Sequence, residues 1–383
     1  MPVSTPRTKT CEVAPGADDA SAILSAVKSC NNGGRVVLAR GAKYTISKPM
    51  DLRDLQHIDI VLQGTLTFSS DTSYWQKNAF KFKFQNAACY FQLGGTDVNV
   101  YGGGTIDGNG GVWGAVFAAN KDAVRPIPVC VVEMNGGSIS DIKMRNSAQW
   151  FNLVVDSKNV VYSGISIDGH AKNTDGWDTL RSDNIVIQNS NINNGDDCVS
   201  FKPGSTNIVV QNLNCKGSHG ISVGSLGQYR GQVDIVEDIY VGNVTMSNAS
   251  SGARIKVWPN VQSTMGELSG GGGTGRVRNI VFEKMHVTNV EWAVLITQCY
   301  AQKDLNKCRS NPTSLAISNV VIKDFTGTTS GKHGSQVGSL ICGSPSVCTN
   351  ISVSNINVKA PGGGSSFECK NIPTAGLKIP CSK

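Results

Sequence analysis

Four short polar segments set in apolar, strand-like surroundings carry side chains suited to acid–base chemistry. They are Asn173-Thr174-Asp175-Gly176, Gly195-Asp196-Asp197-Cys198, Gly217-Ser218-His219-Gly220 and Arg254-Ile255-Lys256. Two carboxylates beside an acetal can act as acid and base, and crowding of like charges raises the pKa of at least one of them. A planar guanidinium next to an ammonium group suits a sugar carboxylate. The question is whether the fold gathers these segments.

A sequence repeat indicates how the fold gathers them. A polar residue followed by apolar ones opens successive strand-like segments, at Asn159, Asn184, Asn207, Asp238, Asn279, Asn319 and Asn350. The first steps are 184 − 159 = 25 and 207 − 184 = 23 residues, and the later steps are longer. Alternating apolar residues indicate strands, not helices. A Gly- and Asn-rich strand repeat of this period predicts an all-β solenoid, a parallel β-helix with three strands per coil.

The chemically active residues keep a common phase within this repeat. Counted from the residue that opens the repeat, Asp196 and His219 each lie 12 residues on, and Asp175 and Arg254 each lie 16 residues on. Residues in phase on adjacent coils stack about 4.8 Å apart. The repeat therefore predicts that the four segments form one patch on one face of the solenoid, where such proteins bind extended ligands.

Bulk composition narrows the function. A continuous repeat over 383 residues predicts a single domain, residues 1–383, and 43 glycines suit stacked strands with tight turns. The net charge of +7 includes no dense Lys/Arg run, so nucleic acid is not expected as a partner. The positive excess fits an acidic ligand or plain solubility. No apolar run is long enough to cross a membrane.

The cysteines indicate an oxidising compartment. Twelve are present, and no CxxC pair matches a zinc site. Close neighbours suggest the disulfides Cys11/Cys30, Cys198/Cys215, Cys299/Cys308, Cys342/Cys348 and Cys369/Cys381, which leaves Cys89 and Cys130 as a sixth candidate pair. Glycosylation motifs occur at Asn243, Asn248 and Asn350. We therefore expect a secreted, extracellular protein, and because no signal peptide is visible, Met1-Pro2-Val3 is expected to begin a mature chain.

The two ends of the solenoid need covers. Residues 18–30 carry the only convincing helix pattern, with Ile23, Val27 and Cys30 on its apolar face, so residues 11–30 are expected to cap the first coil. We expect residues 358–383 to cover the last coil, and the glycine-rich residues 269–275 to project as a loop. The aromatic stretch from Tyr74 to Phe91 is expected to pack the early coils, with a groove wall as the alternative.

Each polar segment has a plainer explanation when taken alone. Asn173 and Asp175 suit turns, and Asn173 also suits an asparagine ladder. Asp196-Asp197 would suit calcium on a β-helix. Cys198 is far better explained as a disulfide partner than as a nucleophile. The joint occurrence of the segments, in phase on stacked coils, favours a catalytic site.

The ordered set Asn-Thr-Asp, Gly-Asp-Asp, Gly-x-His-Gly and Arg-Ile-Lys resembles glycoside hydrolase family 28, the polygalacturonases. The likeness runs from roughly Gly102 to Asn357 and includes Gly103-Gly104-Thr105-Ile106-Asp107-Gly108 and Tyr300. It implies a right-handed parallel β-helix that hydrolyses α-1,4 bonds between galacturonate residues with inversion, without metal or cofactor. By family position the resemblance implies an acid at Asp196, water-holding carboxylates at Asp175 and Asp197, a supporting His219, and substrate contacts from Asn173, Arg254, Lys256 and Tyr300.

Within that family, three features are similar to fungal exopolygalacturonases, which release single residues from the non-reducing end. They are Ser218 where endo enzymes usually have glycine, Trp177 where many have phenylalanine, and the aromatic stretch Tyr74–Phe91. The resemblance implies an acidic plant polysaccharide as the partner, polygalacturonate or oligogalacturonates, and a monomeric enzyme.

Several alternatives remain open. Endo action is the runner-up within the family, and Arg254-Ile255-Lys256 argues against rhamnogalacturonan or xylogalacturonan as the substrate. A calcium-dependent pectate lyase would share the fold but not the order of the aspartates and histidine. A non-catalytic β-helix that binds acidic polysaccharide would keep the cations without needing three aspartates.

Overall fold

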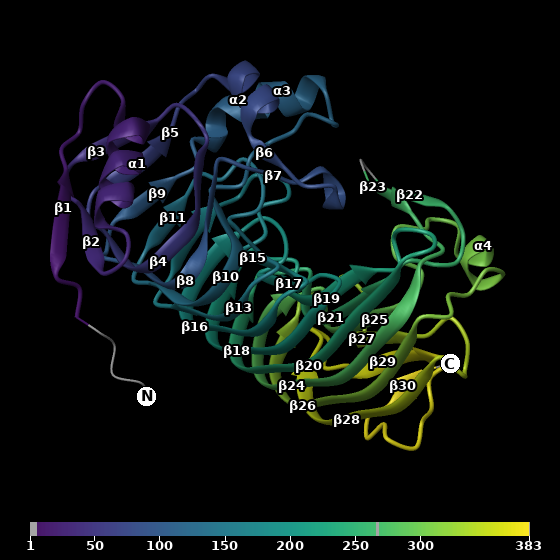
Figure 1. The fold of residues 1–383 in the computed structure, drawn as a ribbon. Coiled ribbons are helices and arrows are strands. Elements are labelled where there is room, and N and C mark those ends of the chain that lie inside the picture. Colours follow the sequence, from purple (N-terminus) through teal and green to yellow (C-terminus); the bar gives the residue numbers. More distant parts are fainter. Residues whose placement is uncertain (1–5, 266–267, 383) are drawn as a thin grey trace. The chain divides into compact units, whose positions relative to one another are not determined.

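The computed structural model describes residues 6–265 and 268–382, so Met1-Pro2-Val3 lies outside the described residues. The chain divides into two compact units, each described by itself: residues 1–177 with 182–195, and residues 178–181 with 196–383. Strand β15 (Trp177–Leu180) contributes residues to both. Figure 1 shows strands as the dominant element along the chain.

The first unit consists of parallel strands with a few short helices. In chain order its elements are β1 (Lys9–Val13), α1 (Asp19–Cys30), β2 (Gly34–Leu38), β3 (Lys43–Ile46), β4 (Met50–Leu62), β5 (Thr65–Phe68), α2 (Thr72–Asn78), β6 (Phe80–Lys81), η1 (Phe84–Asn86), β7 (Ala88–Cys89), β8 (Phe91–Tyr101), β9 (Thr105–Asp107), η2 (Gly110–Val112), α3 (Trp113–Ala119), β10 (Val129–Ser140), β11 (Lys143–Arg145), β12 (Asn152–Val155), β13 (Lys158–Ser163), β14 (Ser166–Gly169) and β16 (Asp183–Asn194).

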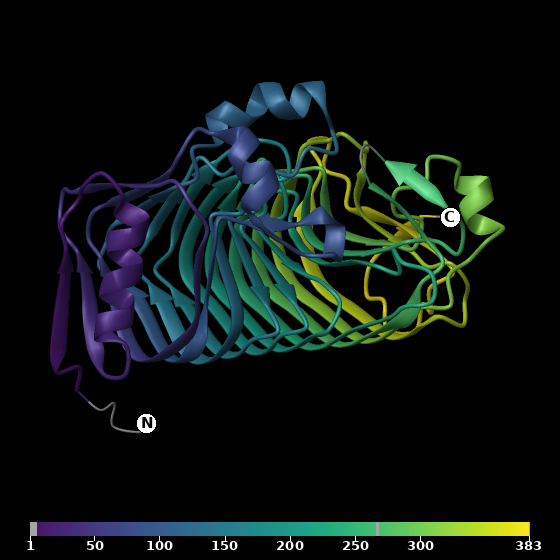
Figure 2. The ribbon, with the colours of Figure 1, turned by 45° about the horizontal axis from the view of Figure 1, so that its top comes forward.

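Parallel ladders connect these strands coil by coil. One ladder runs β1–β2–β4–β8–β10–β13–β16, and a second runs β3–β5–β9–β11–β14 and continues into β16. Figure 2 shows the successive strands lying side by side like rungs. Buried side chains alternate with half-buried ones along β2 and with exposed ones along β3. This alternation places one set of apolar residues inside each coil.

The second unit repeats the same construction. Its elements are β17 (Val199–Phe201), β18 (Ser205–Lys216), β19 (Ile221–Leu226), β20 (Val233–Ser247), β21 (Ser251–Val257), β22 (Ser263–Met265), β23 (Leu268–Gly270), β24 (Thr274–Val290), β25 (Trp292–Thr297), α4 (Leu305–Arg309), β26 (Ala316–Thr329), β27 (Gln336–Ile341), β28 (Cys348–Lys359), β29 (Ser366–Lys370) and β30 (Cys381–Ser382). Parallel ladders run β18–β20–β24–β26–β28 and β17–β19–β21–β25–β27–β29. The predicted all-β, right-handed parallel β-helix is confirmed.

The sequence repeat corresponds to the structural register. Val160 pairs with Ile185 in the first unit, and Ile208 pairs with Ile239, which pairs with Ile280, in the second. The residues that open the repeats have positive φ, for example 52° at Asn184 and 57° at Asn279. Asparagine tolerates this left-handed conformation better than most residues, because its short polar side chain bonds locally.

The same asparagines form hydrogen-bonded ladders on the surface. The Nδ2 of Asn184 donates to the Oδ1 of Asn159 over 2.7 Å, and the Nδ2 of Asn319 donates to the Oδ1 of Asn279 over 3.1 Å. The repeated asparagines of the sequence therefore serve two purposes: they adopt the positive φ at which the backbone bends, and their side chains form a ladder.

The predicted N-terminal helix is confirmed as α1. Asp18 caps it by accepting a hydrogen bond from the amide of Ser21 over 3.0 Å, and Ile23, Val27 and Cys30 are buried. Strand β1 precedes β2 along the chain and pairs with it in parallel. Strand β1 binds by backbone hydrogen bonds, which its short polar sequence does not signal.

The aromatic stretch contributes packing to the first unit. Trp75 and Tyr90 are fully buried, and Tyr90 stacks on Phe68 with ring centroids 3.9 Å apart. Phe80 and Phe84 are only half-buried, at the β6–β7 hairpin and at η1. The stretch thus has a buried part and a surface part.

Residues 269–275 do not form one projecting loop. Leu268–Gly270 is strand β23 in an antiparallel pair with β22, and Gly271, Gly272 and Gly273 donate backbone hydrogen bonds to neighbouring carbonyl groups of the second unit. A Cβ atom on Gly273 would meet the Cα of Gly227 at 2.8 Å, so glycine permits this close backbone approach. At the C-terminus, β29 continues the ladder from β27 and pairs in parallel with β30.

The cysteines are joined in the pairs named from the sequence. The six disulfides are Cys11–Cys30, Cys89–Cys130, Cys198–Cys215, Cys299–Cys308, Cys342–Cys348 and Cys369–Cys381. The pair left over by elimination, Cys89–Cys130, is thus among them, and it links β7 to β10 in the first unit.

Cys308 lies in a helix that the sequence analysis did not predict. The expectation that residues 18–30 form the only helix is wrong, because Cys308 lies in helix α4, which Asp304 caps by accepting hydrogen bonds from the amides of Asn306 and Lys307. Cys308 is buried, and its Sγ lies 3.6 Å from the Gln298 carbonyl oxygen. A disulfide sulfur has no proton to donate, so this approach is a packing contact and not a hydrogen bond. Helix α4 has five residues, too few to show an apolar periodicity in the sequence.

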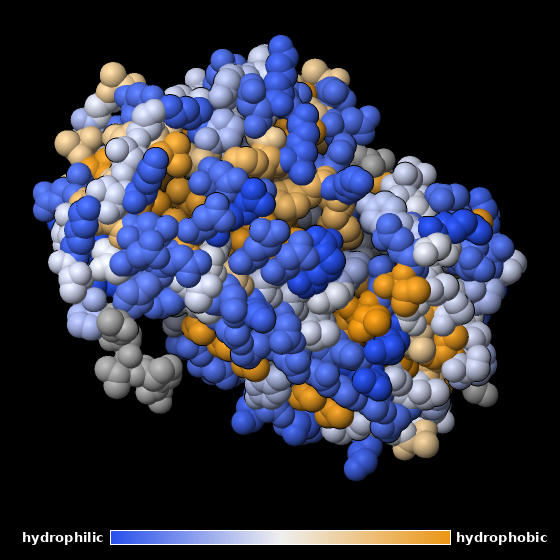
Figure 3. All heavy atoms as spheres, in the orientation of Figure 1, coloured by the Kyte–Doolittle hydropathy of each residue, from blue (hydrophilic) through white to orange (hydrophobic). Residues whose placement is uncertain are grey.

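The three candidate glycosylation sites lie at the surface. Asn243, Asn248 and Asn350 are exposed. Figure 3 shows hydrophilic side chains over much of the visible surface, with hydrophobic residues in separate patches. Within the described ranges, no helix combines the length and the apolar character that a membrane crossing requires.

Candidate active site

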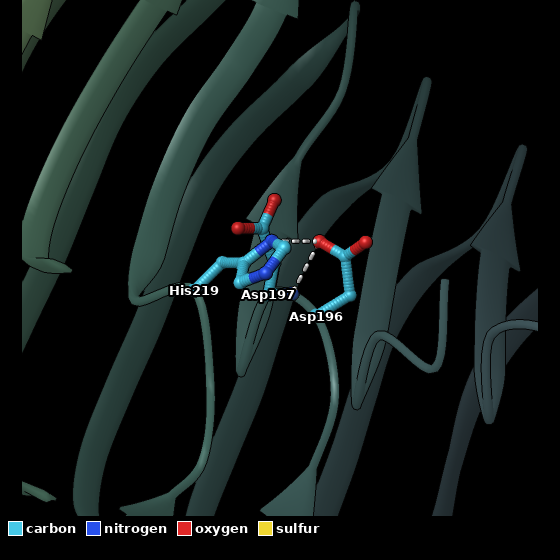
Figure 4. A group of neighbouring side chains, drawn as sticks. All are labelled: Asp196, Asp197 and His219. Carbon is cyan, nitrogen blue, oxygen red and sulfur yellow. Dashed lines mark hydrogen bonds and ion pairs between the residues drawn. The ribbon is translucent and has the colours of Figure 1, made fainter. Parts of the chain in front are cut away.

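Asp196 and Asp197 lie just before β17 in the second unit, separated from the strand by Cys198. The amide of Asp197 donates to the Oδ1 of Asp196 over 2.9 Å, a bond drawn in Figure 4. The disulfide from Cys198 to Cys215 ties the next residue to β18. Two adjacent carboxylates are therefore held on a cross-linked strand end.

Asp196 forms an ion pair with His219. Its Oδ1 lies 2.9 Å from the Nδ1 of His219, and Figure 4 shows the imidazole ring facing this carboxylate. Burial favours a raised pKa at Asp196, but the hydrogen bond from His219 and the nearby cations outweigh burial and lower it. The hydrogen bond to Asp196 in turn raises the pKa of His219. In the free chain the pair therefore favours an ionised Asp196.

Ser218 and His219 also hold the backbone of Asp196. The Oγ of Ser218 donates to the Asp196 carbonyl oxygen over 2.9 Å, and the His219 amide donates to the same oxygen over 2.8 Å. Ser218 is 1% exposed. A glycine at this position would lack the hydroxyl bond, so the serine of this segment has a structural task beside the acid candidate.

Asp197 is enclosed by donors. Its Oδ1 accepts from the Oγ of Ser222 over 2.8 Å and from Arg254, and its Oδ2 accepts from the Nζ of Lys256 over 2.6 Å. The carboxylate is fully buried. Burial alone would raise the pKa of Asp197, but Arg254, Lys256 and Lys202 hold it well below its usual range. Asp197 is thus a permanent negative charge.

Arg254 and Lys256 lie on the same side of β21, as their alternation with Ile255 predicts. Both cations, which the sequence assigned to a substrate carboxylate, bind Asp197 in this structure. The Nζ of Lys256 also lies 5.3 Å from the ring centroid of Tyr300, which packs edge-on against Trp258. Tyr300 therefore lies beside Lys256, as expected for a shared role.

A second buried ion pair adjoins this group, and the sequence analysis missed it. The Nζ of Lys202 lies 3.1 Å from the Oδ1 of Asp178, whose side chain is fully buried. Burial raises the pKa of Asp178 to about 7, although Lys202 opposes the shift. Ser222 was missed as well. The register between coils could have pointed to Ser222, because this residue pairs with Arg254 on the neighbouring coil.

Asn173 and Asp175 belong to the first unit and are described with it. Asp175 is 3% exposed, and its carbonyl oxygen accepts from the Phe151 amide over 2.7 Å. Thr174 fixes the turn by donating to the carbonyl oxygens of Gly169 and Ala171. The Oδ1 of Asn173 accepts from Arg125 over 2.9 Å. Arg125 was not found from the sequence, where no motif marks it.

Six of the predicted site residues come together in the second unit: Asp196, Asp197, His219, Arg254, Lys256 and Tyr300. The possible ligand atoms of Asp196, Asp197 and His219 lie within 4.8 Å of one another. Two cations already bound to Asp197 make this group a poor site for a metal ion. A carboxyl group that can gain a proton, beside a carboxylate that cannot, suits acid catalysis on an acidic ligand.

The chain is similar to proteins of known function. A family model described as "Glycosyl hydrolases family 28" matches residues 30–381. The exopolygalacturonase of Cochliobolus carbonum is 55% identical, with 98% of this chain and 86% of that protein covered. Exopolygalacturonase X-1 of Emericella nidulans is 54% identical, with 100% and 90% covered.

Solved structures share the fold. The endo-xylogalacturonan hydrolase from Aspergillus tubingensis has a TM-score of 0.87 at 34% identity, covering 98% of this chain and 99% of that chain. Endopolygalacturonase I from Stereum purpureum, complexed with two galacturonate, has a TM-score of 0.63 at 20% identity, with 97% and 99% covered. The second likeness bears on the fold alone.

Proposed function

Because this chain belongs to glycoside hydrolase family 28, we propose that it is an exopolygalacturonase. It hydrolyses α-1,4 bonds of polygalacturonate and oligogalacturonates from the non-reducing end, with inversion, and releases galacturonate during pectin degradation. Relatives at 54–55% identity over nearly the whole chain carry this name. The observation that carries the proposal is the contrast between Asp196, paired with a histidine, and Asp197, locked by two cations.

The roles follow the positions of the family's motifs. Asp196 protonates the leaving glycosidic oxygen, and Asp175 and Asp197 hold and activate the water. His219 tunes Asp196. The remaining substrate contacts come from Asn173, Arg254, Lys256 and Tyr300. Inverting enzymes usually separate their carboxyl groups by about 6.5–9.5 Å. Asp197 lies close to Asp196 and is held ionised by its cations, so it is better suited to orienting the water than to accepting a proton from it.

An acid must carry a proton, yet the free chain lowers the pKa of Asp196. A galacturonate carboxylate bound beside this cluster adds negative charge, which disfavours the ionised form of Asp196 and raises its pKa. The substrate would thereby help to protonate its own catalyst. Arg254 and Lys256 would share their positive charge between Asp197 and the sugar carboxylate.

Xylogalacturonan is the second candidate substrate, because a structure 34% identical to this chain is named for its hydrolysis. Endo action on polygalacturonate is the other alternative. Both rank below exopolygalacturonase, because the relatives with that name are far more similar in sequence.

The proposal includes the setting of the enzyme. Residues 1–383 act as a single catalytic domain, monomeric, secreted and extracellular, with glycans at Asn243, Asn248 or Asn350. The six disulfides support an oxidising compartment. The enzyme needs no cofactor, binds no nucleic acid and enters no membrane.

Product profiling tests this proposal. Polygalacturonate and xylogalacturonan are incubated with the protein and a chelator, while viscosity and chain lengths are followed. We expect galacturonate monomer from the earliest time, with slow loss of viscosity, and a much lower rate on xylogalacturonan. Mixed oligomers with rapid viscosity loss would establish endo action. An unsaturated, ultraviolet-absorbing product that chelator abolishes would establish a lyase.

A further inference from the structure

Helix α3, in the first unit, is firmly anchored. Trp113 is 1% exposed and donates from its Nε1 to the hydroxyl of Tyr90 over 2.9 Å. The amide of Gly110, just before the helix, donates to the Asn146 carbonyl over 2.6 Å. The next buried residue of the helix is Phe117. Its ring is thus held in place by the packing of the aromatic stretch.

Three cations surround the ring of Phe117. The Nζ of Lys121 lies 4.5 Å from the ring centroid, the Cζ of Arg125 lies 3.7 Å away, and the Nζ of Lys172 lies 5.5 Å away. A ring face attracts a cation, but three cations around one ring repel one another. We call these four residues the Phe117 cluster. Positive charge is thus concentrated around one aromatic ring.

Arg125 has a structural position within the Phe117 cluster. It is 6% exposed, and it donates to the carbonyl oxygens of Ala148 and Lys172 over 2.7 and 3.0 Å and to the Oδ1 of Asn173 over 2.9 Å. These three acceptors carry no charge themselves, and they fix the guanidinium group in place. Because Arg125 lies over the ring of Phe117, this face is not free to stack on a sugar.

The bond from Arg125 determines which way the Asn173 amide faces. A guanidinium group can only donate, so the oxygen of Asn173 must face it. The NH₂ group of Asn173 then points away from Arg125, and no described residue accepts a hydrogen bond from it. Asn173 is half-buried. It therefore offers two N–H donors next to a group of cations.

The lysines of the cluster are open to solvent. Lys121 and Lys172 are exposed, and Lys121 forms no ion pair with any described residue. Asp122 is adjacent in sequence and exposed, whereas Asp175 is buried. Figure 3, in the orientation of Figure 1, shows hydrophilic side chains on the surface over α2 and α3. Two accessible ammonium groups and an amide donor are complementary to a carboxylate.

We propose that Lys121, Lys172 and the NH₂ group of Asn173 form a binding subsite for a carboxylate of an oligogalacturonate, positioned by Phe117 and Arg125. The inference rests on the proposed function and adds a second carboxylate contact to the one assigned to Arg254 and Lys256. The segment from α3 to Arg125 supplies Lys121 and both positioning residues, so an element added to the strand repeat contributes to the preference for an acidic residue.

Binding of trigalacturonate to charge variants tests the subsite. Lys121→Ala/Lys172→Ala is compared with Lys158→Ala, which removes an exposed lysine on β13. Dissociation constants are measured in an Asp196→Asn background at low and at high salt. We expect the double variant to bind about 10-fold more weakly at low salt, with a smaller difference at high salt because salt screens exposed charges. The control should change affinity less than about 2-fold, as charge screening at a distance requires.

Equal affinities for the double variant and the Lys158→Ala control would overturn the subsite. Turnover separates this failure from failure of the proposed function. If the parent protein releases galacturonate and the double variant does so with an unchanged KM, only the subsite is wrong. If the parent neither binds nor cleaves trigalacturonate, both proposals fall. A double Lys121→Arg/Lys172→Arg variant keeps the charges and should retain affinity, which excludes a loss caused by misfolding.

Discussion

The cluster at Asp197 and the Phe117 cluster both gather cations, but they place the charges differently. Arg254 and Lys256 meet the buried carboxylate of Asp197. Arg125 meets neutral oxygens, and the lysines beside it are exposed. A matched and buried group of charges holds its own geometry, whereas an exposed group can bind a charge from outside.

Basic side chains thus have two different roles in this protein. In the second unit the cations keep Asp197 ionised and leave Asp196 as the carboxyl group able to gain a proton. In the first unit the exposed lysines are accessible to a ligand.

The largest effect is expected from Asp196→Asn. Asparagine cannot donate the catalytic proton, and loss of a general acid costs about 10²–10⁴-fold in turnover. The isosteric control is Asp238→Asn, at an exposed ladder position where other repeats have asparagine. Initial rates of galacturonate release check both variants. Near-parent activity in Asp196→Asn would remove this residue from the acid role.

Lys256→Ala is expected to destabilise the fold by about 3–5 kcal/mol, because it leaves Asp197 buried without one of its cations. Lys323→Ala is the matched control, since Lys323 is 41% exposed and pairs with Glu283 over 2.9 Å. An exposed pair contributes about 0–1 kcal/mol. Denaturant unfolding measures both. Equal losses in the two variants would mean that Lys256 is not part of a structural ion pair.

His219→Gln sharpens the account of Asp196. The hydrogen bond from His219 lowers the pKa of Asp196, so removing it raises that pKa and keeps the acid protonated to higher pH. The alkaline limb of the kcat/KM profile should therefore move upward, since this profile reports groups of the free enzyme. A downward or absent shift would contradict the pairing.

The smallest effect is expected from Ser218→Gly. It removes one hydrogen bond to the Asp196 carbonyl, and the His219 amide remains as the second donor. We expect a loss of about 1 kcal/mol in stability or less than about 10-fold in kcat/KM, with monomer still the first product. A change to mixed oligomers would show instead that Ser218 sets the mode of action.

Much of the fold could be predicted from the sequence, because particular backbone conformations favour particular residue types. Asn184, Asn279 and the other residues that open the repeats need positive φ, and asparagine tolerates it, so the repeat showed in the sequence. Alternation likewise placed Arg254 and Lys256 on one side of β21. Strand β1 was not predicted, because a strand that pairs through its backbone at the edge of a sheet needs no characteristic residue types. The helix around Cys308 was not predicted, because its five residues are too few to show the helical periodicity of apolar residues.

The partners of the site residues were harder to predict. Alternation tells which way Lys256 points, but not that Asp197 lies opposite, because that depends on register between coils whose loops differ in length. Asp178 and Lys202 were missed for the same reason, since no motif marks either residue in its own segment of the sequence. Arg125 lies outside every motif and reaches Asn173 only through the fold.

The most direct test of the account is proton NMR of the first products released from trigalacturonate. Attack by water with inversion, at the non-reducing end, creates a new reducing end on the released monomer. The account predicts galacturonate that appears first as the β-anomer, together with a digalacturonate whose anomers stay in their original ratio. A monomer released as the α-anomer, or new β-anomer on the digalacturonate, would contradict it.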